Sequence, residues 1–401
     1  MSKHTKIIRQ TAVAAIIAMA VTAVSYFLTN LPYSFTGEAD IAAKAYTVLD
    51  VLTGNDDDEV PDSILLINTF YDRELATVVD EYTDTIGNID VVDRRKLYSL
   101  LSQLKQVDNY RYIILDVDFK KGYYTETDDS LFDLIATMER LVVSRHKSST
   151  LATEKLEPVA RYADAYRSMG EVEISKEPLF VNHSDTATLP MAVYLALGGD
   201  SIKGRWPLAY SQGHLARRVI YPRMYVVVNE VYSTVDNFRE PSYTNLGSVL
   251  RDWDMDIACK DKIVVIGAMT EADIHGTVRG DMPGSVVLLN TYISLCKGTQ
   301  LVPWWYIGLL WLFFTLIVYQ LIYGARKNPA EFTSRHLRHR RGAMALSVAL
   351  LWTYYSIALM IFSTVMFIFT GQMCDVFYTS TLLTIAAWSM AIYNKRKQSR
   401  K

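Results

Sequence analysis

Cysteine, proline and glycine are all scarce in this chain of 401 residues. The three cysteines, Cys259, Cys296 and Cys374, are too few and too widely spaced for a zinc framework or a disulfide-rich scaffold. With 11 prolines and 19 glycines, no long low-complexity tract is expected. The sequence also lacks a G-x-S-x-G elbow, a G-x-x-x-x-G-K-[ST] loop and an H-E-x-x-H motif. We therefore predict a protein that is not an enzyme, with no catalytic residue, no cofactor and no dedicated metal site.

Four stretches carry too little charge over too great a length to be ordinary core helices. They cover residues 11–28, 301–323, 343–369 and 376–393, and the last is the weakest because it contains several serines and threonines. We predict four transmembrane helices, one N-terminal and three C-terminal. A cleaved signal peptide is the alternative for the first stretch, but its apolar run is long and no clean A-x-A site ends it.

Lysine and arginine cluster in three segments that share one side of the membrane if the chain crosses four times. The segments are the N-terminal tail (Lys3, Lys6, Arg9), the 326–341 loop (Arg326, Lys327, Arg335, Arg338, Arg340, Arg341) and the C-terminal tail (Lys395, Arg396, Lys397, Arg400, Lys401). The positive-inside rule places that side in the cytoplasm and the large domain on the other side of the membrane. Contact with the anionic headgroups of the lipid bilayer accounts for these basic segments.

The region between the first and second spans is therefore expected outside the cytoplasm. It keeps 27 of the 41 basic residues and 41 of the 43 acidic ones, so its formal net charge is near −14. Such an acidic surface argues against nucleic acid as a partner. We predict three parts: a tail and anchor (1–30), an extracytoplasmic domain (31–300) and a three-span bundle with a basic loop and tail (301–401).

Short apolar runs alternate with helical patterns in the extracytoplasmic domain. Strands are predicted at 63–68, 112–118, 141–144, 178–182, 224–228 and 262–267, and helices at 72–82, from Asp93 onward, at 128–140, 189–197 and 285–297. Strands separated by helices imply βαβ crossovers, so we predict an α/β domain whose mainly parallel sheet lies between helix layers.

Polar side chains gather where these strands end. In an open parallel sheet, ligands bind outside the carboxyl ends of the strands. Candidate ligand-binding residues at these ends are Asn68, Asp116, Asp118, Asp273, His275 and Thr277. Carboxylates and an imidazole near a helix N-terminus could hold a small polar ligand or a hard cation. The competing interpretation is that these groups cap helices and fix the 268–284 loop.

A possible disulfide follows from the predicted order of strand and helix. If the helix at 285–297 runs back along the strand at 262–267, its end brings Cys296 toward Cys259, and such a bridge would stabilise the domain by about 4 kcal/mol. Two buried free thiols are the alternative.

The layout resembles the CHASE2 family of bacterial sensory input domains. The likeness rests on SILLIN (63–68), YIILDVDF (112–119), LPMAVYLAL (189–197) and the block KIVVIGAMTEADIHGTVRGDMPGSVVLLNTYISLCKG (262–298), which leads directly into the spans. Two departures are Asn68, where many relatives have Asp, and the absence of a Trp-Pro-rich segment after that strand. Relatives usually carry a kinase or cyclase after the last span, whereas this sequence ends at Lys401.

The resemblance implies a multi-pass sensor in a bacterial inner membrane, with its large domain in the periplasm. It also implies that the sensor passes a signal to a separate partner protein. Its predicted partners are the bilayer, an unidentified membrane or cytoplasmic protein, a small extracytoplasmic ligand and a second copy of the chain. The alternative is a structural or scaffolding subunit of a cell-envelope complex. An enzyme would need Asp116, Asp118 and His275 to converge. A transporter is disfavoured because the spans have almost no ionisable residues.

Overall fold

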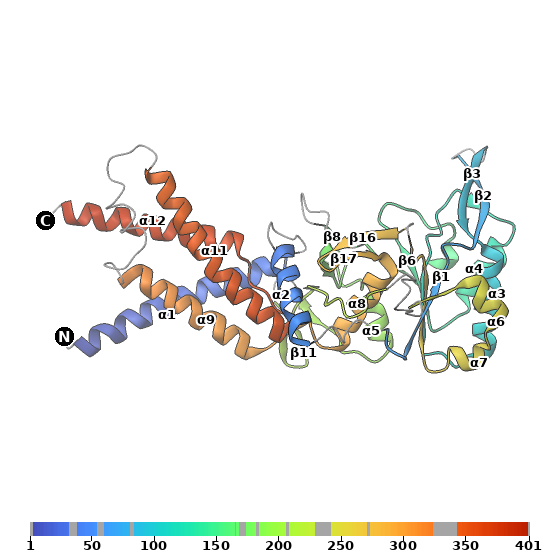
Figure 1. Ribbon diagram of the computed structural model, residues 1–401, viewed down its shortest axis with the longest axis horizontal. Helices are drawn as coiled ribbons and strands as arrows, with labels where there is room; N and C mark the ends of the chain where they lie inside the picture. The colour runs from blue at the N-terminus through green and yellow to red at the C-terminus, as the bar shows by residue number, and fades with distance from the viewer. Residues whose placement is uncertain are drawn as a thin grey trace, which may run out of the picture.

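The computed structural model describes residues 3–31, 38–53, 60–80, 84–164, 166–167, 174–181, 184–205, 208–228, 242–270, 273–323 and 343–399. The molecule is elongated, with long helices at one end and an α/β domain at the other (Figure 1). The start of α1 (Lys3–Thr29) and the end of α12 (Phe377–Ser399) lie together at the helical end. The acidic segment 55–59 (NDDDE) lies outside the described residues.

A six-stranded parallel sheet forms the centre of the α/β domain, in the order β14-β1-β15-β4-β6-β7. The bounds are Thr244–Asn245 (β14), Ile64–Asn68 (β1), Ile263–Gly267 (β15), Tyr112–Asp116 (β4), Leu141–Arg145 (β6) and Ala160–Tyr162 (β7). β1 and β15 are buried along their whole length, as their unbroken apolar runs predict for strands covered on both faces. The predicted parallel α/β core is confirmed.

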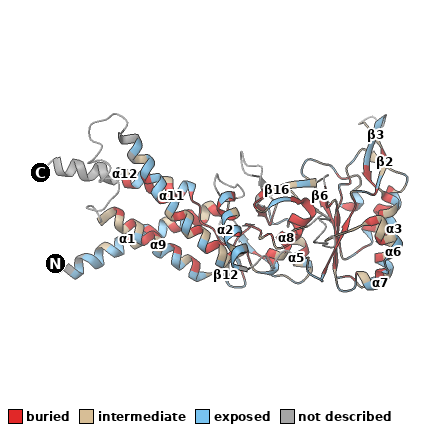
Figure 2. Ribbon diagram, viewed as in Figure 1, coloured by how far each residue is buried: buried red, intermediate tan, exposed pale blue. Residues whose placement is uncertain are grey.

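Helices cover both faces of this sheet. On one face lie α3 (Arg94–Val107), α4 (Asp128–Ala136), α6 (Leu246–Asp252) and α7 (Met255–Ala258), with the short 3-10 helix Glu154–Leu156 nearby. On the other face lie α5 (Leu189–Ala196) and α8 (Gly284–Cys296). The alternating side chains of β1 enter these two cores in turn, Leu66 the core beneath α8 and Ile67 the core beneath α3. Figure 2 shows the buried strands between the two helix layers.

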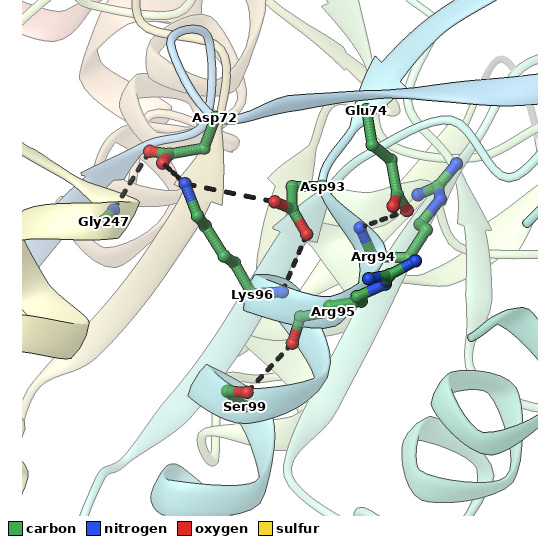
Figure 3. Close-up of polar contacts among 8 residues, drawn as sticks. All are labelled: Asp72, Glu74, Asp93, Arg94, Arg95, Lys96, Ser99 and Gly247. Carbon is green, nitrogen blue, oxygen red and sulfur yellow. Dashed lines mark hydrogen bonds and ion pairs between the residues drawn. The ribbon is translucent and has the colours of Figure 1, made fainter. Parts of the chain in front are cut away.

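Charged side chains fix the start of α3, as Figure 3 shows. Asp93 caps the helix by accepting a hydrogen bond from the backbone N–H of Lys96 at 3.0 Å, as its position in the sequence predicts. The buried carboxylate of Asp72 accepts from the Lys96 ammonium at 2.6 Å and from the backbone N–H of Gly247 at 3.0 Å. One carboxylate thereby joins the segment after β1 to α3 and α6.

The predicted helix at 72–82 is wrong, because the segment forms β2 (Arg73–Val79). β2 pairs antiparallel with β3 (Thr85–Val92) and with β5 (Tyr123–Tyr124), while residues 81–83 lie outside the described residues. The β-branched run Thr77, Val78 and Val79 favours a strand, and only Ala76 of β2 is fully buried. Local helical periodicity was therefore overridden by strand propensity and hairpin pairing.

The strand predicted at 224–228 is also wrong. This segment has no strand partner among the described residues, and a side chain of α8 takes that role. The amide of Asn290 accepts from the backbone N–H of Val226 at 2.8 Å and donates to the carbonyl of the same residue at 2.8 Å. The strand predicted at 178–182 is displaced, since β9 covers Ile174–Pro178.

Three small sheets complete the domain. One contains β10 (Lys203–Arg205), β11 (Leu208–Ser211), β12 (His214–Ala216) and β18 (Leu301–Val302), and the β2–β3–β5 sheet is the second. The third joins β8 (Tyr166–Arg167), β9, β13 (Val219–Ile220), β16 (Ile274–Thr277) and β17 (Gly280–Pro283). The predicted 268–284 loop is thus largely the β16–β17 hairpin.

Within the described residues, three helical segments are long and apolar enough to cross a membrane, at Ile7–Thr29, Trp304–Tyr323 and Val348–Thr370. They belong to α1, α9 (Trp304–Tyr323) and α11 (Ala343–Thr370), and α1 packs along α9. An additional helix, α2 (Glu38–Thr53), packs against α11. The fourth predicted span forms α12, whose crossing of the membrane stays a prediction, and the basic 326–341 loop lies outside the described residues.

The predicted disulfide is not formed, and Cys259, Cys296 and Cys374 are free thiols. α8 does follow β15, but the two cysteines lie on opposite sides of the sheet. Cys259 is buried in the core beneath α3, where its thiol contacts the carbonyl of Met255 at 2.7 Å, whereas Cys296 is exposed at the end of α8 on the other face. The sheet between them prevents the bridge.

Candidate functional site

A cavity of about 200 Å³ opens at the carboxyl ends of β4 and β6, beside the N-terminus of α8. The β16–β17 hairpin and β9 form its outer wall. Its lining residues are Asp116, His146, Ala163, Asp164, Ile174, Glu177, Asp273, His275, Gly284, Val287 and Leu288. Strand-end placement is where an open parallel sheet binds ligands, so the cavity is the candidate site.

Asp116 is the last residue of β4 and points into the cavity from the sheet edge. Burial, and then the negative charge of Asp273, raise the pKa of this carboxyl to about 6. Asp116 is therefore a carboxyl group that titrates near neutral pH.

Two imidazole–carboxylate pairs flank Asp116. His275 Nε2 lies 2.9 Å from Asp273 Oδ1, and His146 Nδ1 lies 3.6 Å from Asp164 Oδ1. The carboxylate of Asp164, followed by the charges of Asp116 and Asp118, raises the pKa of His146 to about 9 despite partial burial. His146 is therefore a cation at neutral pH, and Asp164 balances its charge.

Glu177, on β9, is the most deeply buried acid of the cavity, with 2% of its surface exposed. Its Oε1 atom has no hydrogen-bond partner in the described part of the chain. Burial, and then the charge of Asp164, raise the pKa of Glu177 to about 8. This carboxyl is mostly protonated at neutral pH.

The remaining wall is apolar and comes mainly from α8. Val287 and Leu288 of α8 line the cavity together with Ile174 of β9. Gly284, at the first turn of α8, approaches the Asp273–His275 pair so closely that a Cβ atom there would lie 3.1 Å from His275 Nε2. The cavity thus combines charged groups at the sheet edge with a hydrocarbon surface on the helix.

The structure brings together three of the six predicted ligand-binding residues, Asp116, Asp273 and His275. Asp118 lines a neighbouring cavity of about 270 Å³, which shares Asp116, His146 and Asp273 with the first. Asp116, Asp118 and His275 therefore do not converge on a single one of these two cavities.

Asn68 and Thr277 do not line either of the two cavities. The Asn68 amide donates to Asn245 Oδ1 and accepts from the backbone N–H groups of Phe70 and Met269, each at 3.0 Å. The Thr277 hydroxyl donates to the carbonyl of Gly280 at 2.7 Å inside the β16–β17 turn. Both fix local structure, as the competing interpretation of the sequence expected.

Sequence reasoning missed His146, Asp164 and Glu177. His146 directly follows β6, so extending the strand-end rule by one residue would have found it. Asp164 follows β7 and Glu177 lies within β9, two short segments whose strand pairing had no clear signal in the sequence. These two acids reach the cavity through tertiary packing.

In the described segments, no group of three or more histidine, cysteine or acidic side chains is arranged to hold a metal ion. The geometry therefore gives no support to the hard-cation interpretation of the strand-end acids.

Comparison with known proteins identifies the domain. The family model of the CHASE2 domain matches residues 46–321, which is more than half of the chain and includes the parallel sheet, the cavity and most of α9. No curated protein and no solved structure matches the chain. CHASE2 is a sensory, extracytoplasmic domain, and this chain belongs to the CHASE2 family.

Proposed function

We propose that this protein is an integral membrane sensor whose strand-end cavity binds a small extracytoplasmic ligand. The supporting observation is that one helix, α8, both lines the cavity and leads into the membrane helices. Its first turns carry Gly284, Val287 and Leu288, and a few residues after its end β18 and α9 begin. A ligand that changes the position of α8 would thereby act on α9. The proposal assigns binding and no chemical step.

Arg223 links the far end of α8 to the spans. Its backbone N–H donates to Ser294 Oγ of α8 at 2.8 Å, and its guanidinium donates to the carbonyls of Phe367 and Ile368 at 2.5 and 2.6 Å. These carbonyls belong to the last turn of α11, where a cation is favoured by the helix dipole. Movement of α8 is therefore transmitted to α11 as well as α9.

Gln372, in the turn between α11 and α12, makes a second link. Its buried amide donates to the carbonyls of Thr299 and Leu301 at 2.8 and 3.2 Å and accepts from the guanidinium of Arg217. Thr299 and Leu301 lie in the connection between α8 and α9. The outer domain, which is the α/β domain with its cavity, and the bundle of long helices thus share buried polar contacts. A ligand can shift the equilibrium between two arrangements of these contacts only by as much as its affinity for the two arrangements differs.

In the proposed orientation the domain lies in the periplasm of a bacterium and the three basic segments lie in the cytoplasm. The longest of these, the 326–341 loop, is the proposed contact for a separate output partner, either a membrane or a cytoplasmic protein. Its length supports this assignment.

Photo-cross-linking in cells tests the proposal. A photoreactive residue in place of Arg338 is expected to capture a partner protein, and Asp116→Asn is expected to change the yield because it alters the cavity. The same photoreactive residue in place of the exposed Gln106 on α3 is the matched control on the outer side. A reporter fused at residue 150 that proves cytosolic, or a capture yield indifferent to Asp116→Asn, would contradict the proposal.

The scaffolding alternative has one supporting observation. The β2–β3 hairpin projects from the domain (Figure 1) and exposes Leu75, Ile86 and Ile89. Exposed apolar side chains on a hairpin suit the docking of another protein. If Leu75→Ser abolishes co-purification of envelope proteins while Asp116→Asn has no effect, scaffolding is the better description.

A further inference from the structure

The cavity contains more acid than its own bases balance. Four carboxyl groups line it, Asp116, Asp164, Glu177 and Asp273, against the imidazoles of His146 and His275. His146 is paired with Asp164, and His275 with Asp273. The lining pairs therefore leave two carboxyl groups, Asp116 on β4 and Glu177 on β9, facing the same space.

Glu177 is the group that points to a ligand. Burying a carboxyl oxygen without a hydrogen-bond partner is costly, and such groups are rare in folded proteins. The preceding residue, Lys176, does not serve as the missing partner, because successive side chains of a strand point to opposite faces. The Lys176 ammonium lies over the ring of Tyr221, 5.0 Å from its centroid.

Resting on the proposed function, we infer that the cavity binds a small organic ammonium ion. The N–H groups of the ammonium donate to Glu177 Oε1 and to the carboxylate of Asp116. Its carbon portion packs against Ile174, Val287 and Leu288, the apolar wall described above. The ligand class thus follows from two features of the cavity: Glu177 Oε1 is a hydrogen-bond acceptor without a donor, and it lies in the same cavity as an apolar wall.

The shape and donor set favour an organic cation over a metal ion. Among the described residues no three acidic or histidine side chains converge as metal ligands. A cavity of about 200 Å³ has the volume of roughly seven water molecules, enough for a short alkyl chain or a single ring. A bare divalent ion would also leave the wall formed by α8 uncovered.

Binding should release a proton. Glu177 is protonated near neutral pH, and a charge-assisted hydrogen bond from an ammonium favours its carboxylate form. The balanced step is a carboxylic acid plus a free ammonium giving an ammonium–carboxylate pair plus one proton in solution. The charged groups that line the cavity together with Glu177 are Asp116, Asp164, Asp273, His146 and His275, and Asp164 is the one whose charge raises its pKa, while α8 contributes no charged side chain to the lining.

Calorimetric titration of the full chain in phosphatidylglycerol nanodiscs tests the inference, because these lipids carry no amine of their own. Benzylammonium is the probe, and benzyl alcohol and benzoate are the neutral and anionic comparisons. We expect benzylammonium to bind at least about tenfold more tightly than either. Repeating the titration at pH 7 in buffers of different ionisation enthalpy should detect release of about one proton.

Glu177→Gln keeps the size of the side chain and removes its charge. We expect it to weaken benzylammonium binding by about tenfold or more and to abolish proton release. Asp133→Asn, which changes an exposed acid on α4 away from the cavity, is the matched control and should leave both unchanged.

Equal binding of benzyl alcohol, or unchanged binding in Glu177→Gln, would overturn the ammonium inference. Folding of the variant is checked by its thermal melt, so a lost signal from unfolding is recognised. The proposed sensor function fails separately, through the cross-linking test with Asp116→Asn. If Asp116→Asn changes the cross-linking yield but benzylammonium does not bind, the proposed sensor function stands and only the ammonium ligand class is wrong.

Discussion

Glu177 also makes the stability of the domain depend on pH. Its pKa in the folded protein is about 8, raised first by burial, against an ordinary value of 4.5. A carboxyl whose pKa is raised by folding contributes stability fully below the unfolded pKa, and that contribution is lost as the pH rises through the folded pKa. The free energy of unfolding should therefore fall by up to a few kcal/mol between about pH 4.5 and pH 8.

We predict that Glu177→Gln removes most of this decline, so that the variant exceeds the wild type in stability at pH 8 and loses the advantage near pH 4. Thermal unfolding of the full chain at a series of pH values measures the difference. Asp133→Asn serves as the control, because its carboxylate is exposed and paired with Lys155 at the surface. Parallel curves for wild type and Glu177→Gln would show that the carboxyl is not buried as described.

The cysteines give a second prediction at this scale. Cys296 is exposed, whereas Cys259 has no exposed surface and Cys374 is buried. A maleimide should label only Cys296 in the native protein, and all three thiols should react in denaturant without reductant. Recovery of two peptides joined by a disulfide between Cys259 and Cys296 would contradict this prediction, because the helices place the two cysteines on opposite sides of the sheet.

Individual site residues could be predicted only where the backbone alone places them. Asp116 was found because it ends an apolar strand, and the carboxyl edge of a parallel sheet is a fixed place in space. Glu177 could not be found in this way, because it enters the cavity from a separate small sheet. Asn68 satisfied the same rule as Asp116, yet its amide is used by backbone and side-chain hydrogen bonds.

At the scale of elements, the junction between the β16–β17 hairpin and α8 shapes the cavity. Gly284 begins α8 there, and a Cβ atom would lie 3.0 Å from Asp273 Cγ and 3.1 Å from His275 Nε2. We predict that Gly284→Ala displaces this pair and lowers stability by about 1 to 3 kcal/mol, the cost of overpacking. Ligand binding should fall with it.

Gly87→Ala is the matched control for that prediction, because a Cβ atom at Gly87 on β3 meets nothing within 4 Å. Thermal melts of both variants give the comparison. If Gly284→Ala and Gly87→Ala behave alike, the hairpin has room to move away from α8, and the close approach does not shape the cavity.

Elements with one strong pattern were predicted well, and those with mixed signals were not. The leucine spacing of α3 and its Asp93 cap define a helix without tertiary help. The spacing of apolar residues in β2 fits a helix as well as one strand of a hairpin. Its pairing with β3, which is eight residues long, decides in favour of the strand. The segment 224–228 has the composition of a strand but is held by the Asn290 side chain, which no pattern in the sequence reveals.

At the scale of the whole molecule, the sequence predicts the parts and leaves their contacts open. Apolar length identifies α1, α9 and α11 as candidate spans, and the alternation of strands and helices identifies the sheet domain. The buried contacts between the two ends involve single polar residues far apart in the chain, such as Arg217 with Gln372. Their pairing depends on the folded arrangement.

Gln372 provides the test of that coupling. Replacing it with leucine removes the acceptor of the buried Nε–H of Arg217 and the donor to the carbonyls of Thr299 and Leu301, while Arg217 Nη2 keeps the carbonyl of Met373 at 3.3 Å. Leaving the buried Nε–H of a charged guanidinium without a partner costs about 3 kcal/mol, so the melting temperature of Gln372→Leu should fall. Because these bonds join the outer domain to the bundle, we also expect the single thermal transition to separate into two.

Tryptophan fluorescence follows mainly the bundle, because five of the seven tryptophans lie in α9, α11 and α12, among them Trp304 and Trp305 at the start of α9. Maleimide labelling of the buried Cys259 follows the outer domain. Gln106→Leu, an exposed change on α3, is the control for the substitution itself. In Gln372→Leu the two probes should report different melting temperatures, whereas in the control they should agree. Coincident transitions in both would mean that the domain and the spans are joined mainly by apolar packing, and α8 would then act on α9 through the chain connection alone.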